Sequence, residues 1–291
     1  MKKSTRIVVP HLAFRTNLLE YCIQAFPVLG SRTAVKKAIF SDQLLLNDRP
    51  AKLSDHIQKG DVLELRQKHI SKRKSIQLEL PVVFEDDHLI IVNKPGGIAV
   101  NGNRNKTVEN AVRTNRSERL HDDRLPQVVA VHRIDVPTKG LVMLAKTKRA
   151  LVEMGRQFQQ RAVKKVYYAI AHGKMIGNGS INQRLADREA ITDFEVQRVV
   201  ASRKFKHLSL VRLMPRTGRT HQLRLHLQQR GHLIVGDKQY AARQQTILGK
   251  GLFLCATDLA FQHPITQQSI HAHIDMPDRF HRLLERETSR F

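Results

Sequence analysis

The stretch HRIDVPTKGLVMLAK, residues 132–146, joins a single acid to an apolar run with the composition of a buried strand. Asp135 lies between Arg133 and a short loop, and the apolar run begins at Leu141. A carboxylate held in such a loop can act as a nucleophile. The pattern also fits a turn residue that pairs with Arg133, because ion pairs involve many structural acids. By itself the stretch leaves both interpretations open.

The charge of the chain restricts its partners. The 291 residues include 50 Lys and Arg against 26 Asp and Glu, which gives a formal net charge of +24. Neutralising phosphates releases their counterions, so such a surplus predicts a nucleic-acid partner. Solubility alone requires a net charge of only about 2 to 8 in a small domain.

The composition also excludes several classes of protein. Hydrophobic residues make up 41% of the chain, enough for a core in each of about two domains. No apolar run approaches the roughly 18 residues of a membrane span, so we expect no membrane partner. Cys22 and Cys255 lack the spacing of a zinc site and fit a reducing compartment. We therefore expect a soluble cytoplasmic protein without a bound metal.

The chain is expected to form two domains. Residues 66–75, RQKHISKRKS, are rich in basic residues and have no apolar period. We place a linker at residues 67–80, between a first domain at 10–66 and a second at 81–291.

The first domain is predicted to contain two helices and a small strand pair. Residues 12–26 have helical spacing, and Ser31 is a suitable N-cap for a second helix that extends to residue 40. Residues 44–47 and 62–65 are the predicted strands, separated by turn-forming residues.

With this order of elements, the segments SRTAVKKAI, LLLND and GDVLEL resemble the α-L RNA-binding module, also called the ribosomal-S-four-type domain. The resemblance implies RNA contacts by the second helix, at Ser31, Arg32, Lys36 and Lys37. A basic helix is also often just a solvated face. Asp42 and Gln43 replace the glycine that usually precedes the first strand, which leaves the turn geometry open.

The second domain is predicted to have an α+β fold. Strand-like runs occupy residues 76–84, 89–93, 141–145, 163–171 and 208–213. Helical spacing is found at 148–160, at 220–229 before Gly231, and after Pro277. The mixture predicts a large mixed or antiparallel sheet with flanking helices.

Five ordered motifs in the second domain together resemble the RluA-type RNA pseudouridine synthases, over about residues 81–275. The motifs are EDDHLIIVNKPGGIAV (85–100), HRIDVPTKGLVMLAK (132–146), KVYYAIAHG (165–173), RTGRTHQLRLHLQQRGHLIVGDKQY (216–240) and LFLCATDLAFQHP (252–264). The implied reaction moves uracil from an N1 link to a C5 link on ribose, without net oxidation, so no cofactor is expected. The chain has no phosphate-binding glycine motif and no HExxH, and His121 beside Asp122 reads as a solvated loop.

The resemblance implies the roles of several residues. Asp135 is the expected nucleophile, and Arg224 is expected to pair with it and keep it ionised. Attack on ribose C1′, attack on the base at C6 and assistance in loss of the C2′ proton all remain open. Tyr167 is expected to stack on the target base and to serve in proton transfer at C5, although a core aromatic would show the same pattern. Arg224 could instead contact a phosphate.

Binding of the RNA is expected to involve further residues. A uracil in folded RNA must be extruded, and Arg133 matches the position that assists this step. Leu254 is expected to form an apolar wall of the pocket. Further candidate RNA contacts are Lys94, Arg216, Arg219 and His221.

Two positions depart from the family pattern: Lys139 replaces a serine after the acid, and Cys255 replaces a common histidine. Lys139 could add a phosphate contact or indicate a divergent substrate. We expect a monomer that acts on structured ribosomal RNA. The alternatives are a synthase acting on tRNA and a non-catalytic RNA-binding or ribosome-assembly factor.

Overall fold

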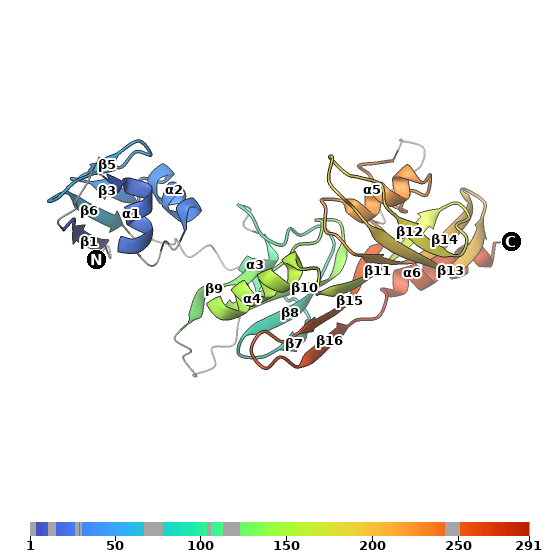
Figure 1. The fold of residues 1–291 in the computed structure, drawn as a ribbon. Helices are drawn as coiled ribbons and strands as arrows, with labels where there is room; N and C mark the ends of the chain where they lie inside the picture. Colours follow the sequence, from blue (N-terminus) through green and yellow to red (C-terminus); the bar gives the residue numbers. More distant parts are fainter. Residues whose placement is uncertain are drawn as a thin grey trace. The chain divides into compact units, whose positions relative to one another are not determined.

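The computed structural model describes residues 4–10, 16–26, 29, 31–66, 78–103, 106–112, 123–241 and 251–290. The chain divides into two compact units, Met1–Arg73 and Lys74–Phe291, and each has its own buried hydrophobic residues (Figure 1). His121 and Asp122 lie outside the described residues, as does most of the expected linker. Leu78 and Leu80, which we had placed in the linker, pack against the core of the second unit.

The first unit combines two helices with a four-stranded sheet in the order β1-β6-β3-β4 (Figure 1). The helices are α1 (Leu18–Ala25) and α2 (Arg32–Phe40). The strands are β1 (Ser4–Val8), β3 (Leu44–Leu46), β4 (Arg49–Pro50) and β6 (Val62–Arg66), and β2 (Thr16–Asn17) pairs separately with β5 (His56–Ile57). β1 pairs with β6 along its whole length, so the unit begins before the predicted residue 10.

The first helix starts later than predicted. Residues 16–17 are extended, and the Asn17 side chain accepts the backbone N–H of Leu19 at 2.9 Å, which caps α1. The prediction of a helix over residues 12–26 was therefore wrong at its N-terminal end, while residues 11–15 lie outside the described part. Asparagine favours a cap over a helix interior because its side chain competes for backbone N–H groups.

The second helix forms as predicted. The Ser31 hydroxyl accepts the N–H of Ala34 at 3.2 Å, and Val35, Ala38 and Ile39 enter the core. Asp42, in the turn that follows, has φ 51°. Aspartate tolerates this left-handed conformation better than most residues, so the turn forms here without a glycine.

The second unit contains one ten-stranded sheet, whose main path is β12-β13-β14-β11-β15-β10-β8-β7, with β16 beside β15 and β9 beside β10. The strands are β7 (Val82–Glu85), β8 (Leu89–Lys94), β9 (Arg124–Ala130), β10 (Lys139–Thr147), β11 (Lys164–His172), β12 (Asn178–Ile181), β13 (Thr192–Ser202), β14 (Lys206–Pro215), β15 (Leu254–Gln262) and β16 (Ser269–His273). The helices are α3 (Val108–Ala111), α4 (Lys148–Gln159), α5 (Gln222–Gln229) and α6 (Asp278–Thr288). This α+β fold with a large mixed sheet confirms the prediction.

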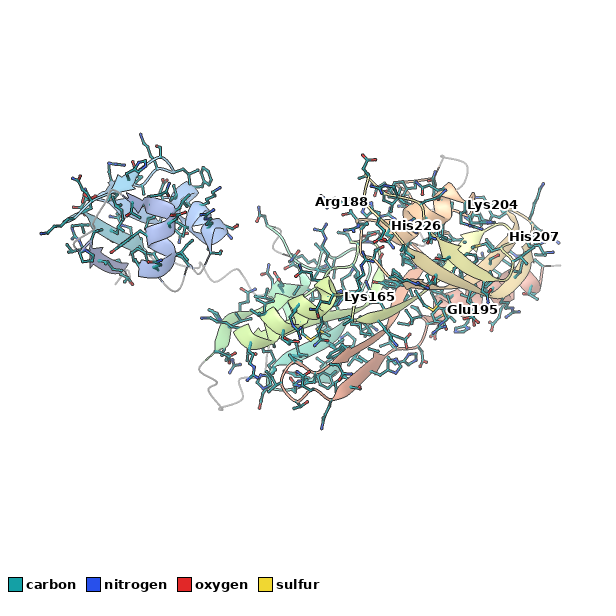
Figure 2. All side chains as sticks on the ribbon, viewed as in Figure 1. Lys165, Arg188, Glu195, Lys204, His207 and His226 are labelled. Atoms are coloured by element: carbon teal, nitrogen blue, oxygen red, sulfur yellow. The ribbon has the colours of Figure 1, made fainter. Side chains whose placement is uncertain are left out.

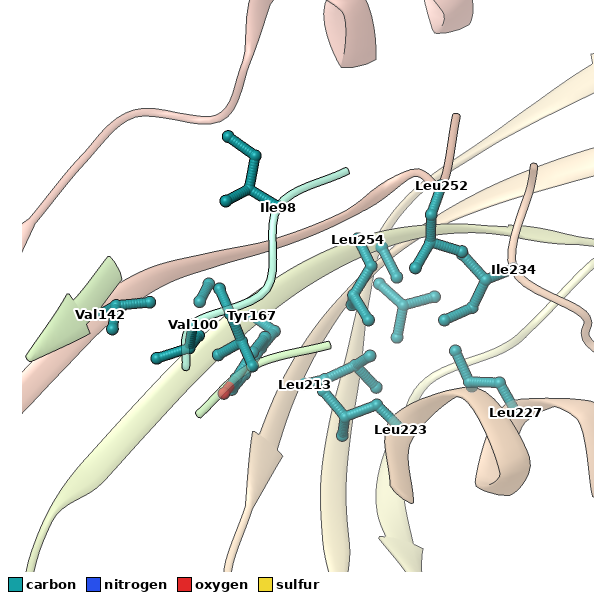
Figure 3. Packing of buried hydrophobic residues seen from close by; sticks show 14 of the residues in the cluster. Ile98, Val100, Val142, Tyr167, Leu213, Leu223, Leu227, Ile234, Leu252 and Leu254 are labelled. Atoms are coloured by element: carbon teal, nitrogen blue, oxygen red, sulfur yellow. The ribbon is translucent and has the colours of Figure 1, made fainter. Parts of the chain in front are cut away.

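Separate hydrophobic clusters lie on the two faces of the sheet. Tyr167 of β11 packs with Leu213, Leu223 and Leu254 in one cluster (Figure 3). Its neighbour Tyr168 packs against a separate cluster, as expected for successive residues of a strand.

The contact between β10 and β15 is short and parallel, whereas the other strand pairings in the described sheet are antiparallel. It pairs Lys139 with Cys255 and Gly140 with Ala256. Gly140 has φ 112°, and a Cβ at this position would overlap the backbone of Ala256. Glycine therefore permits the close approach that places the loop of Asp135 beside β15.

No described helix has both the length and the apolarity that a membrane crossing requires.

Candidate active site

The loop that carries Asp135 connects β9 to β10. It turns tightly, since the N–H of Thr138 donates to the carbonyl of Asp135 at 3.0 Å. A second loop meets it where the N–H of Gly97 donates to the carbonyl of Val136 at 2.7 Å. The Asp135 side chain remains 23% exposed, so it can be reached from solvent.

Lys94 joins these two loops from within the protein. Its ammonium donates to the carbonyls of Pro95, Ile98 and Val136 at 3.0, 2.9 and 3.2 Å, and the residue is fully buried. The prediction that Lys94 contacts RNA was therefore wrong. Burial lowers the pKa of Lys94 to about 8, although the negative charge of Asp135 opposes the shift. Its role is to fix the backbone beside Asp135.

Arg224, at the start of α5, faces Asp135. Its Nη1 donates to Oδ2 of Asp135 at 3.3 Å, and its side chain is only 3% exposed. The rest of the guanidinium is held from behind: Nε and Nη2 donate to Asp237 at 2.7 and 2.8 Å, and Nη2 also donates to Gln239 at 3.1 Å. The expected pairing of Arg224 with Asp135 is present in this geometry.

Electrostatics favour the charged form of Arg224. Burial alone would disfavour the cation, but hydrogen bonds and charge from Asp237 and Asp135 outweigh burial and raise the pKa of Arg224. Asp237 was within a quoted motif, but we did not single it out. A buried arginine implies a buried carboxylate partner, yet the sequence offers 26 acids and no means of choosing among them.

A pocket of 560 Å³ opens in front of Asp135. Eight of the predicted site residues line it together: Arg133, Asp135, Tyr167, Arg216, Arg219, His221, Arg224 and Leu254. Lys94 is not among the lining residues. Ser31, Arg32, Lys36 and Lys37 belong to the first unit, where all four are exposed on α2 or at its N-cap.

Tyr167 and Leu254 contribute to the apolar part of the pocket. Both are largely buried and pack in the same cluster (Figure 3). Burial raises the pKa of Tyr167 well above its ordinary value, and the charge of Asp135 adds to the shift. The phenol is therefore neutral at physiological pH.

The remaining lining is rich in cations. Arg216 donates to Asp193 at 2.6 Å, while the Arg219 Nε donates to the carbonyl of Glu189 at 2.9 Å. Lys165, two residues before Tyr167 on β11, also lines the pocket (Figure 2). Burial lowers the pKa of Lys165. We did not single out Lys165 from the sequence, although strand alternation places it on the side of Tyr167.

Potential metal ligands occur at two places, and at both of them the side chains form hydrogen bonds within the protein. His132 in the pocket is half-buried, and its Nε2 accepts the N–H of Met143 at 3.1 Å. Burial lowers its pKa to about 3, so it stays neutral. Outside the pocket, Asp258, His271 and His273 gather on β15 and β16, and Oδ1 of Asp258 accepts from both imidazoles at 3.0 and 2.8 Å.

The two departures from the family pattern do not alter the pocket wall. Lys139 and Cys255 are paired across β10 and β15, and neither lines the pocket. Cys255 is fully buried in the cluster on the other side of the sheet, which also contains Phe253 and Phe280.

Comparisons with known proteins agree with this arrangement. The family described as RNA pseudouridylate synthase matches residues 88–229, a segment that contains Asp135, Tyr167 and Arg224. The dual-specificity RNA pseudouridine synthase RluA of Vibrio parahaemolyticus is 35% identical over 199 residues, which cover 63% of this chain and 78% of the relative. Ribosomal large subunit pseudouridine synthase C of the same species is 28% identical over 282 residues, which cover 87% of each chain.

A solved structure shows the same fold. It is human RNA pseudouridylate synthase domain containing 4, with a TM-score of 0.57 at 23% identity, covering 71% of this chain and 92% of that one. The sequence relatives, the matched family and the shared fold agree. The chain belongs to the RNA pseudouridylate synthase family.

Proposed function

We propose that this RNA pseudouridine synthase modifies uridines in structured ribosomal RNA, with Asp135 as its nucleophile. The observation that supports this assignment is the position of Asp135 in the pocket, 3.3 Å from the buried guanidinium of Arg224. A buried cation at this distance stabilises the carboxylate in its reactive form. The remaining pocket residues act on the base and on the phosphate backbone.

The reaction balances without an external reagent. The N1–C1′ bond breaks, the C5–C1′ bond forms, C5 loses a proton and N1 gains one. Asp135 could attack ribose C1′, attack the base at C6 or accept the C2′ proton, and each of these roles requires the ionised acid. In all three cases the negative charge lies beside Arg224, which limits the reorganisation needed during the reaction.

The target uridine must leave its stack to reach Asp135. Tyr167 and Leu254 offer apolar surfaces for the two faces of uracil. Because the phenol of Tyr167 is neutral, it can stack and hydrogen-bond but is a poor base at C5. Arg133 lies exposed on the same loop as Asp135, where it can occupy the vacancy or bind a phosphate.

The preference for ribosomal RNA has three supports. Synthase C of Vibrio parahaemolyticus, whose name refers to the ribosomal large subunit, matches 87% of this chain, whereas RluA matches 63%. The first unit also presents exposed Arg32, Lys36 and Lys37 on one helix, as the α-L resemblance implies. A net charge of +24 suits a large, structured RNA.

The test measures release of tritium from RNA labelled at uracil C5, because formation of the new bond expels that hydrogen. Ribosomal RNA and tRNA fractions are incubated separately with wild type, Asp135→Asn and Asp275→Asn, a control whose side chain is fully exposed. We expect release from ribosomal RNA by wild type and the control, and none by Asp135→Asn at unchanged RNA affinity.

Each other outcome contradicts a defined part of the proposal. Release from tRNA alone would overturn the ribosomal substrate. Release by Asp135→Asn at the wild-type rate would overturn the nucleophile. No release by wild type from either fraction would favour a non-catalytic RNA-binding role.

A further inference from the structure

The two oxygens of Asp135 face different partners. Oδ2 accepts from Arg224, while Oδ1 lies 3.8 Å from Nε2 of His221. The other ring nitrogen of His221, Nδ1, is 2.6 Å from the hydroxyl of Tyr240. Asp135, His221 and Tyr240 therefore form a row of groups that can each carry a proton, with a hydrogen bond between His221 and Tyr240 and a longer 3.8 Å separation between His221 and Asp135.

The backbone at His221 is in an unusual conformation. His221 has φ 56° and ψ 21°, in the left-handed region, and occupies the N-cap of α5 without a side-chain capping bond. This conformation costs free energy in a residue other than glycine, and such residues cluster at functional sites. Here the imidazole faces Asp135 and Tyr240 and does not cap the helix.

Tyr240 is held by the groups that hold Arg224. Its N–H donates to Oδ1 of Asp237 at 3.3 Å, and its ring lies under the Arg224 guanidinium at 4.8 Å. Tyr240 is partly exposed, which places this end of the row near solvent. The row thus leads from the pocket to solvent.

We propose that His221 and Tyr240 form a proton relay between Asp135 and solvent. The inference rests on the proposed function. Asp135 accepts the proton that C5 loses and passes it to Nε2 of His221. Nδ1 of His221 then gives its own proton to the Tyr240 oxygen, and the hydroxyl proton of Tyr240 passes to water. The same steps in reverse supply the proton that N1 gains, so each turnover restores all three groups.

Other described residues of the pocket are poorly suited to this task. Nε2 of His132 is occupied by a backbone N–H, and Lys165 and the arginines offer donors in their charged forms. His221 differs because both of its nitrogens lie beside other titratable groups.

Two substitutions of His221 separate the relay from a structural role. His221→Asn keeps a residue that tolerates positive φ but cannot relay a proton. We expect it to lower kcat about 100-fold, the lower end of the general acid–base range, with KM within about twofold of wild type. His221→Gly also tolerates the backbone, and added imidazole should restore its turnover in a saturable manner. If His221 had only a structural role, added imidazole would not restore turnover.

Tyr240→Phe and His281→Asn complete the set. Tyr240→Phe keeps the ring under Arg224, and we expect about a tenfold fall in kcat because His221 must then exchange with water directly. His281 is an exposed histidine of α6, so its substitution should leave turnover unchanged. Thermal unfolding of each variant checks that the fold is retained.

The outcomes distinguish the relay from the proposed function. Full turnover by His221→Asn, or failure of imidazole to rescue His221→Gly, would overturn the relay if wild type is active and Asp135→Asn is not. Absence of turnover in wild type would instead remove the proposed function, and the relay with it.

Discussion

Arg224 donates to both carboxylate oxygens of Asp237, at 2.7 and 2.8 Å, and both side chains are almost wholly buried. One nitrogen, Nη1, remains directed at Asp135. Asp237 thus fixes the orientation in which Arg224 meets the acid in the pocket. A two-point contact of this kind constrains the plane of the guanidinium as well as its position.

Replacing Asp237 by Ala should destabilise the protein by about 3–5 kcal/mol, because it leaves a buried guanidinium without its main partner. Urea unfolding measures the loss. The matched control is the double variant Arg224→Met/Asp237→Leu, which should recover much of the stability but show no tritium release. A stable single variant with full turnover would contradict the role given to this pair.

Acid should weaken the same pair. Burial alone would raise the pKa of Asp237, but hydrogen bonds and charge from Arg224 outweigh burial and lower it below the ordinary 3.8. The folded state therefore binds this proton less readily than the unfolded chain, so the stabilisation is present above about pH 4 and is lost as the pH falls further. Wild type should lose unfolding free energy more steeply than Asp237→Asn below pH 4, as urea titrations at each pH would show. Parallel curves would refute this linkage.

Lys94 should affect the dependence of unfolding free energy on pH at the alkaline end of the range. Its pKa is about 8 in the folded state against an ordinary 10.5, so the unfolded chain binds the proton more tightly between these values. The stability of wild type relative to Lys94→Met should therefore rise with pH from about 8 to 10.5, by at most about 3.5 kcal/mol at 1.4 kcal/mol per pKa unit. Denaturant unfolding at both limits measures the rise, and a flat difference would contradict it.

Both cysteines should be unreactive in the native protein. Cys22 and Cys255 are buried, and burial raises the pKa of each thiol to about 12. A chromogenic disulfide reagent should label neither thiol in buffer and both in denaturant. Rapid labelling of one cysteine in the native state would show that its cluster opens, and a Cys→Ala substitution at each site would identify which.

Deletion of residues 1–73 should leave a folded second unit that binds RNA more weakly. The two units have separate buried clusters, so the second unit keeps its own hydrophobic core after the deletion. The shortened chain also loses the exposed cations of α2, so the slope of log affinity against log salt should decrease. A triple variant of Arg32, Lys36 and Lys37 to Gln, in the full chain, should reproduce part of this decrease. Unchanged salt dependence in both would exclude the first unit from RNA binding.

Local patterns in the sequence were sufficient for most elements. Helical spacing and the hydroxyl of Ser31 predicted α2, and runs of aliphatic residues predicted β8, β10, β11 and β14. These features depend on backbone propensity, capping and the period of apolar residues, all of which act over a few positions. Motif resemblance added Asp135, Tyr167 and Arg224, which the structure brings into one pocket.

Tertiary structure alone decided which of the many polar residues meet. A lysine is usually exposed, so the sequence favoured Lys94 as an RNA contact, whereas three carbonyls from two loops bury its ammonium. Asp237 and Tyr240 lie 13 and 16 positions after Arg224, and no local pattern relates them to it. The sequence by itself determined the charge, predicted most of the elements and offered Asp135 as the candidate acid. The pairing of charges and the row from Asp135 to Tyr240 depend on sheet register and loop closure, which arise from contacts between distant segments.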